Sequence, residues 1–190
     1  MMEDFQQRNL SSMVYLLGIS HKFQWKKDLP NAREFKDYLK KKSKSLKIDL
    51  IAEEFSEEGL KKNKIKNTIP QEVAEDLNIT HKFCEPNKED LEKIGWISYG
   101  KIKKRLGFDD PILAGSPEDK AIIKEQRKFY YIRETYWLKQ LEQYKNKNIL
   151  FICGKDHIHN SNSLKSLLNE FGFNYKILPQ RFTGWWGGIK

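Results

Sequence analysis

Short, continuous apolar runs constrain the fold of this chain more than any other feature. The clearest runs are residues 13–17 and 149–153, which end at Gly18 and at Gly154, and a similar segment at residues 48–52, interrupted by Asp49, ends at Glu53-Glu54. Such runs, bounded by turn residues or charges, are typical of strands that are buried on both faces of a sheet. We interpret residues 78–83 and 173–178 as two weaker strands.

Segments with helix-start signals lie between these runs. Asn31, with Glu34 three residues later, has the pattern of a capping box and predicts a helix from Ala32 to about Lys42. Further start signals are Thr68 with Pro70, Asn87, Ser116 with Pro117, and Ser161 or Ser163. We expect the helix after Ser116 to run to about Tyr144. The alternation predicts a single α/β domain over residues 1–190, with a mostly parallel central sheet flanked by helices.

The composition and the N-terminal residues indicate the cellular compartment of the protein. Apolar residues make up 38% and aromatic residues 13%, enough to close a core. No stretch approaches the roughly 18 apolar residues of a membrane span, and the acidic start at residues 1–4 is unlike a secretion signal. We therefore expect a cytoplasmic protein with no membrane partner. Its two cysteines, Cys84 and Cys153, are too few for a disulfide framework, and we expect Cys153 to be buried and inert.

The net charge points to a polyanion as one candidate partner. The chain has 35 Lys and Arg residues against 26 Asp and Glu residues, a formal charge of +9. This balance can favour nucleic acid. The excess is mostly lysine, in runs at residues 40–44, 61–66 and 101–104, and lysine is also the ordinary solvated surface residue.

A Gly-x-x-His pattern follows two of the predicted strands, at Gly18–His21 and at Gly154–His157. Ligands bind at the carboxyl ends of parallel strands, so we expect the glycines to let the chain turn sharply and the two imidazoles to meet there. Other polar residues that follow predicted strands are Glu53, Glu54, His81, Glu85 and His159.

Two imidazoles and a carboxylate suit a divalent transition metal such as Mn²⁺, Co²⁺ or Zn²⁺. We expect His21, Glu53 and His157 to be the ligands, and the metal to make a nucleophile from bound water. Without a metal, the same groups can act as acid and base. For any one histidine, the alternative to a functional role is that of a loop residue whose side chain hydrogen-bonds to the backbone.

Arg133 lies on the aromatic face of its helix, four residues after Phe129 and four before Trp137. A buried arginine needs an anionic partner, for which Glu53, Glu54 or a substrate group would serve. The alternative is a boundary residue whose charge reaches solvent. We expect Trp137 to be a core residue.

The C-terminal tail, residues 179–190, is rich in glycine and tryptophan and contains Trp185-Trp186. Two adjacent tryptophans cannot both face inward on a regular element. The tail can fold back and pack, or form a lid, a docking patch or an exposed aromatic platform.

The order of these motifs resembles the superfamily that includes erythromycin esterases, ChaN haem-uptake proteins, and the TraB and Tiki proteins. The resemblance rests on Gly18–His21, Glu53-Glu54, Arg133 and Gly154–His157, across about residues 13–170. It implies an α/β fold with these residues at one end of the sheet, and Glu53 is the better positional match to the family glutamate. Members include metal-dependent proteases, esterases not tied to a metal, and haem binders. His81 and Glu85 match no family motif.

Three functional hypotheses follow. The first is a hydrolase, with or without a metal, that cleaves a peptide, ester or phosphoester in a peptide or small-molecule substrate. Its site would contain His21, Glu53 or Glu54, Arg133 and His157, with His81, Glu85 and His159 as further candidates. The second is a non-catalytic protein that binds haem or another ligand. The third is a basic effector that acts on nucleic acid.

Overall fold

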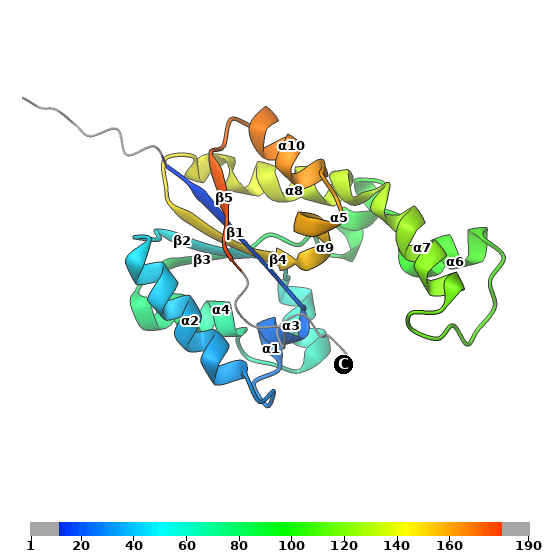
Figure 1. Ribbon diagram of the computed structural model, residues 1–190, viewed down its shortest axis with the longest axis horizontal. Coiled ribbons are helices and arrows are strands. Elements are labelled where there is room, and N and C mark those ends of the chain that lie inside the picture. Colours follow the sequence, from blue (N-terminus) through cyan, green and yellow to red (C-terminus); the bar gives the residue numbers. More distant parts are fainter. Residues whose placement is uncertain (1–11, 180–190) are drawn as a thin grey trace, which may run out of the picture.

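A five-stranded parallel sheet lies between two layers of helices in the computed structural model, which describes residues 12–179 (Figure 1). The strands are β1 (Val14–Ile19), β2 (Leu50–Glu53), β3 (Thr80–Phe83), β4 (Ile149–Gly154) and β5 (Tyr175–Ile177). Their order is β3-β2-β4-β1-β5, and each neighbouring pair is parallel. The prediction of a mostly parallel sheet flanked by helices is confirmed.

Helices cover both faces of the sheet. Successive side chains of a strand point to opposite faces, so each strand contributes residues to both cores. Leu150 and Ile152 of β4 pack under α2 (Ala32–Ser45) and α4 (Ile69–Leu77). Phe151 and Cys153 pack under α8 (Tyr130–Leu141) and α10 (Ser163–Glu170). Double burial explains why these strands read as continuous apolar runs. Both cysteines are free and buried.

The strand order gathers the three motif-bearing strands. β4 lies between β1 and β2. The chain leaving β1 enters α1 (Lys22–Trp25), whose Phe23 packs in the α2–α4 core. The chain leaving β4 enters α9 (Lys155–His159), whose Ile158 packs in the core on the other face. Because these connections diverge to opposite faces, they open a crevice at the carboxyl ends of the strands.

Some of the predicted helix N-caps are present in the structure and others are not. Thr68, Asn87 and Ser116 each accept a bond from the backbone N–H three residues later, as predicted. The prediction of a capping box at Asn31 is wrong. Asn31 has φ −101° and ψ 10°, which is not the extended geometry of an N-cap, and its side chain makes no capping hydrogen bond. Asn162, rather than Ser161 or Ser163, precedes α10.

The single helix predicted from Ser116 to Tyr144 is also wrong. It is divided into α7 (Pro117–Arg127), α8 and a short 3₁₀ helix, η1 (Glu142–Tyr144). The break falls at Lys128 and Phe129, whose N–H groups bond to carbonyls three residues back rather than four. The remaining helices are α3 (Glu57–Asn63), α5 (Lys88–Lys93) and α6 (Tyr99–Arg105).

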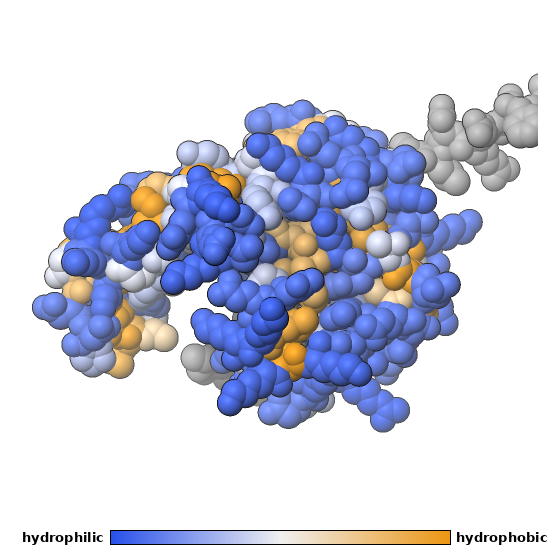
Figure 2. All heavy atoms as spheres, turned by 180° about the vertical axis from the view of Figure 1, so that it is seen from behind, coloured by the Kyte–Doolittle hydropathy of each residue, from blue (hydrophilic) through white to orange (hydrophobic). Residues whose placement is uncertain are grey.

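Helices α6 and α7 form an arm that projects from the sheet body (Figure 1). The view from behind shows an open hollow between this arm and the body, and a mostly hydrophilic surface (Figure 2). Within residues 12–179, no helix combines the length and apolar character needed to cross a bilayer. The Trp185-Trp186 tail lies outside the described residues.

Candidate active site

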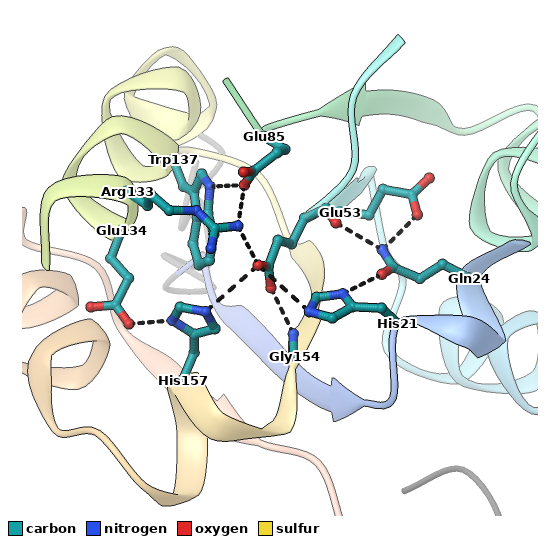
Figure 3. A network of polar contacts seen from close by, with 10 residues as sticks. His21, Gln24, Glu53, Glu85, Arg133, Glu134, Trp137, Gly154 and His157 are labelled. Carbon is teal, nitrogen blue, oxygen red and sulfur yellow. Dashed lines mark hydrogen bonds and ion pairs between the residues drawn. The ribbon is translucent and has the colours of Figure 1, made fainter. Parts of the chain in front are cut away.

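Glu54 is the centre of a buried polar network at the carboxyl end of the sheet. Figure 3 labels the residues that contact it, His21, Arg133, Gly154 and His157. Glu54 directly follows β2, and its side chain is 2% exposed. Its Oε2 accepts a bond of 2.8 Å from the N–H of Gly154 at the end of β4. Burial alone raises the pKa of Glu54, but the neighbouring His21, His157 and Arg133 outweigh burial and hold the pKa well below its usual range.

His21 approaches Glu54 from the end of β1. Its Nε2 lies 3.7 Å from Oε1 of Glu54, and its side chain is 52% exposed. Its Nδ1 lies 3.0 Å from Oε1 of Gln24. The amide of Gln24 is oriented by donation from its Nε2 to Glu53 and to the carbonyl of Glu54. Oε1 of Gln24 can therefore only accept, so the neutral His21 ring carries its proton on Nδ1 and leaves Nε2 unprotonated.

His157 approaches the same oxygen from α9, on the other side. Its Nε2 lies 3.6 Å from Oε1 of Glu54, and its Nδ1 lies 2.6 Å from Oε1 of Glu134. The ring is stacked on Tyr130, with 4.2 Å between centroids. Burial lowers the pKa of His157, but the charge of Glu54 and the hydrogen bond to Glu134 raise it further, to about 9. The imidazole is therefore protonated at neutral pH.

Arg133 of α8 completes the network. Its Nη2 donates to Glu54 Oε1 at 2.6 Å and to Glu85 Oε2 at 2.7 Å. Its guanidinium lies 4.8 Å from the ring centroid of Trp96 and 5.3 Å from that of Trp137. Arg133 is thus the buried arginine with anionic partners, and the boundary alternative is wrong. Burial raises the pKa of Glu85, against the opposing charge of Arg133.

The sequence analysis placed Glu53 between the histidines, and the structure places it elsewhere. Glu53 is fully buried and turned the opposite way, because consecutive strand residues face opposite sides of a sheet. Its carboxylate accepts from Thr68 and Gln24 and lies 2.9 Å from Nε2 of His81. The metal set of His21, Glu53 and His157 does not form. Glu54 takes the position that Glu53 was expected to occupy.

The groups that do meet suit an ion-pair network better than a metal. Two imidazoles and one glutamate are a known ligand set for catalytic zinc. However, Oε1 of Glu54 is already bonded to Arg133, and His157 is protonated. Metal ligation requires a deprotonated imidazole. Across residues 12–179, no three His, Cys, Asp or Glu side chains form a group that could hold a metal ion. In this arrangement Oε1 of Glu54 is held by Arg133 rather than left open to a cation.

Neither Gly-x-x-His glycine forms the expected turn, and Gly154 acts by its size rather than by its conformation. Gly154 has φ −60° and ψ 137°, which other residues adopt, and Gly18 lies within β1 rather than at a turn. The expected sharp glycine turn is therefore wrong. A Cβ on Gly154 would lie 2.8 Å from Nε2 of His21 and 3.4 Å from Oε2 of Glu54. Glycine leaves the space in which the imidazole meets the carboxylate.

Two hollows open onto this network from different sides. His21, Glu54 and Arg133 line both. The first, of about 490 Å³, extends over α3 and includes Phe55, Lys62 and Lys88. The second, of about 390 Å³, extends under α7 and α8 and includes Gln126, Tyr130 and His157. A substrate bond placed over His21 therefore has room for a group on either side.

The structure adds two site residues that the sequence analysis missed. Glu134 carried a signal, because it shares the buried stripe of α8 with Tyr130 and Trp137, where a carboxylate needs a partner. Gln24 had no such signal in the sequence, because the four-residue helix α1 is too short to show a hydrophobic periodicity. His159, a further candidate, is exposed at the end of α9.

Comparison with protein-family models, curated proteins and solved structures finds no match to this chain.

Proposed function

We propose that this protein is a hydrolase that works by acid–base catalysis at His21, beside the buried carboxylate of Glu54. The observation that carries the proposal is the convergence of one half-exposed imidazole, one buried imidazole and one buried guanidinium on a single carboxylate oxygen. Ionisable groups with strongly shifted pKa values, gathered in a crevice at strand ends, are typical of catalytic sites.

His21 is the general base in this proposal. Its Nε2 is unprotonated in the neutral ring, and the residue lines both hollows. Water gives a proton to Nε2 as its oxygen attacks the carbonyl or phosphoryl centre, and the leaving group then takes that proton from the imidazolium. Glu54, 3.7 Å away, stabilises the imidazolium while it exists. His157 and Arg133 keep Glu54 ionised, and their charge favours the developing oxyanion.

The substrate class is an ester, amide or phosphoester with a group on each side of the reacting centre. Hollows on both sides of His21 support this requirement. The resemblance to erythromycin esterases and their relatives supports a hydrolytic reaction through the same motifs, with Glu54 as the corresponding glutamate. A metal-dependent form would require Arg133 to leave Glu54 and His157 to lose its proton.

The test is a panel of chromogenic esters, peptides and phosphoesters, assayed with protein dialysed against a chelator. We expect turnover by the wild type and a loss of about 10²–10⁴-fold in His21→Ala. His159→Ala is the matched control, because it removes an exposed histidine at the same edge of the sheet. Activity that is retained in His21→Ala contradicts the proposal. A Soret band on haem addition, lost in His21→Ala, would favour the ligand-binding alternative.

A further inference from the structure

A group of lysines lies beside the candidate active site, on α1, on α3 and on the residues that directly follow each helix. This α1–α3 lysine cluster consists of Lys22, Lys26, Lys62, Lys64 and Lys66. Of the ion pairs found within residues 12–179, none involves these five side chains. The neighbouring Lys27 and Lys36 show the contrast, since both pair with Glu72. An unpaired cluster of this kind attracts a polyanion from solution.

An aromatic hollow lies inside the cluster. The residues that line this space of about 410 Å³ are Trp25, Ile65, three lysines (Lys26, Lys27 and Lys66) and one acidic residue, Asp28. Trp25 is half-buried, and Nζ of Lys26 lies 5.3 Å from the centroid of its ring. An aromatic face among cations is the arrangement by which proteins stack an unpaired base and hold its phosphates.

The cluster leads directly into the candidate active site. His21 immediately precedes α1, and Trp25 ends it, so the two are separated by roughly 6 Å along the helix axis. On the other side, α3 lines the larger hollow through Gly59 and Lys62, and the chain continues to Ile65 and Lys66 in the aromatic hollow. An extended polyanion that lies along this surface would therefore reach Glu54.

We propose that the α1–α3 lysine cluster and Trp25 bind single-stranded nucleic acid, with a base on Trp25 and phosphates on the lysines. Stacking on Trp25 requires an unpaired base, which a duplex does not offer. An acidic peptide would use the lysines and leave the tryptophan hollow empty. The overall charge of +9 supports the same partner. This binding does not depend on the proposed hydrolysis and is tested separately.

The experiment is fluorescence anisotropy of labelled 12-nucleotide single strands of RNA and DNA with the full chain, from 50 to 300 mM salt. We expect Lys62→Glu/Lys64→Glu/Lys66→Glu to weaken binding at least tenfold and to reduce the salt slope by about 2, at roughly 0.7 per phosphate contact. Trp25→Ala should weaken binding about 5- to 150-fold, with little change in the slope.

The matched control is Lys41→Glu/Lys44→Glu/Lys47→Glu, at the opposite end of the sheet. Both sets contain three exposed lysines, and each has one at positive φ, 53° for Lys64 and 50° for Lys47. Circular dichroism and melting curves check that the variants fold. No binding at 50 mM salt, or equal losses in both triple variants, would overturn the proposal. So would polyglutamate or duplex DNA competing as well as a single strand.

Discussion

Glu53 and Glu54 are neighbours in the sequence, and each is the centre of a different buried network. Glu53 faces Thr68, Gln24 and His81, which are two hydrogen-bonding groups and one partly exposed imidazole. Glu54 faces Arg133, His157 and His21 and is the shared counter-ion of that cluster. The alternation of a strand thus places one carboxylate in a structural role and the next in the crevice.

The largest expected effect comes from removing each charge in turn. Glu54→Gln leaves Arg133 and His157 with one fewer anion in a buried site, so we expect a loss of about 3–5 kcal/mol in the free energy of unfolding. Glu53→Gln keeps an oxygen that can accept from Thr68, so we expect a loss of about 1–3 kcal/mol. Urea unfolding of both variants measures the difference. Equal losses would remove the distinction between the two networks.

The stability of the fold should depend on pH through His157 and Glu54, which both belong to the second network. The folded pKa of His157 is raised to about 9, so its stabilisation is complete below its unfolded pKa of 6.5 and is lost as pH rises through 9. This pKa shift of His157 corresponds to a contribution of about 3 kcal/mol to the free energy of unfolding. Glu54 has the opposite sign: its contribution is present above its ordinary pKa and is lost as pH falls towards the lowered value.

We therefore expect the free energy of unfolding to decrease between pH 6.5 and 9 in the wild type and in Glu53→Gln. The decrease should be much smaller in Glu54→Gln, where the main cause of the raised pKa is absent. Urea titrations at several pH values give these slopes. A slope that persists in Glu54→Gln would assign the alkaline loss to another group.

Gln24 connects the two networks, and its removal should affect catalysis more than stability. In Gln24→Leu, Nδ1 of His21 loses its acceptor, so the ring is free to rotate and to change tautomer. We expect kcat/KM to fall about 10²-fold, mainly through kcat, because the base is misplaced. Thr68→Val is the matched control on the Glu53 side. If Thr68→Val lowers kcat equally, Gln24 is not the connection that matters.

The smallest effect on stability is expected from Gly154→Ala. The new Cβ would lie 2.8 Å from Nε2 of His21, and the half-exposed ring can move away. We expect the free energy of unfolding to change by less than about 0.5 kcal/mol, while kcat falls. Gly100→Ala, where nothing lies within 4 Å of the new Cβ, is the control. An unchanged kcat in Gly154→Ala would show that the position of His21 is not critical.

The sequence predicted the sheet well, because doubly buried strands such as β4 leave continuous apolar runs. It also predicted that His21, Arg133 and His157 would meet, since all three follow from strand ends or from a helical aromatic face. It failed on Glu53 against Glu54, because adjacent residues of one strand have identical local signals and opposite faces. Gln24 and the divided helix at Lys128 depend on tertiary contacts that no local pattern records.

The most direct test of Glu54 as the shared counter-ion is a pH titration of the histidine side chains by ¹⁵N–¹H NMR. The chain has four histidines, and His157→Asn assigns one of them. We predict that His157 titrates near 9 in the wild type and in Glu53→Gln, and at a clearly lower pH in Glu54→Gln. A wild-type His157 that titrates near its ordinary value of 6.5, or one that responds to Glu53→Gln instead, would contradict this prediction.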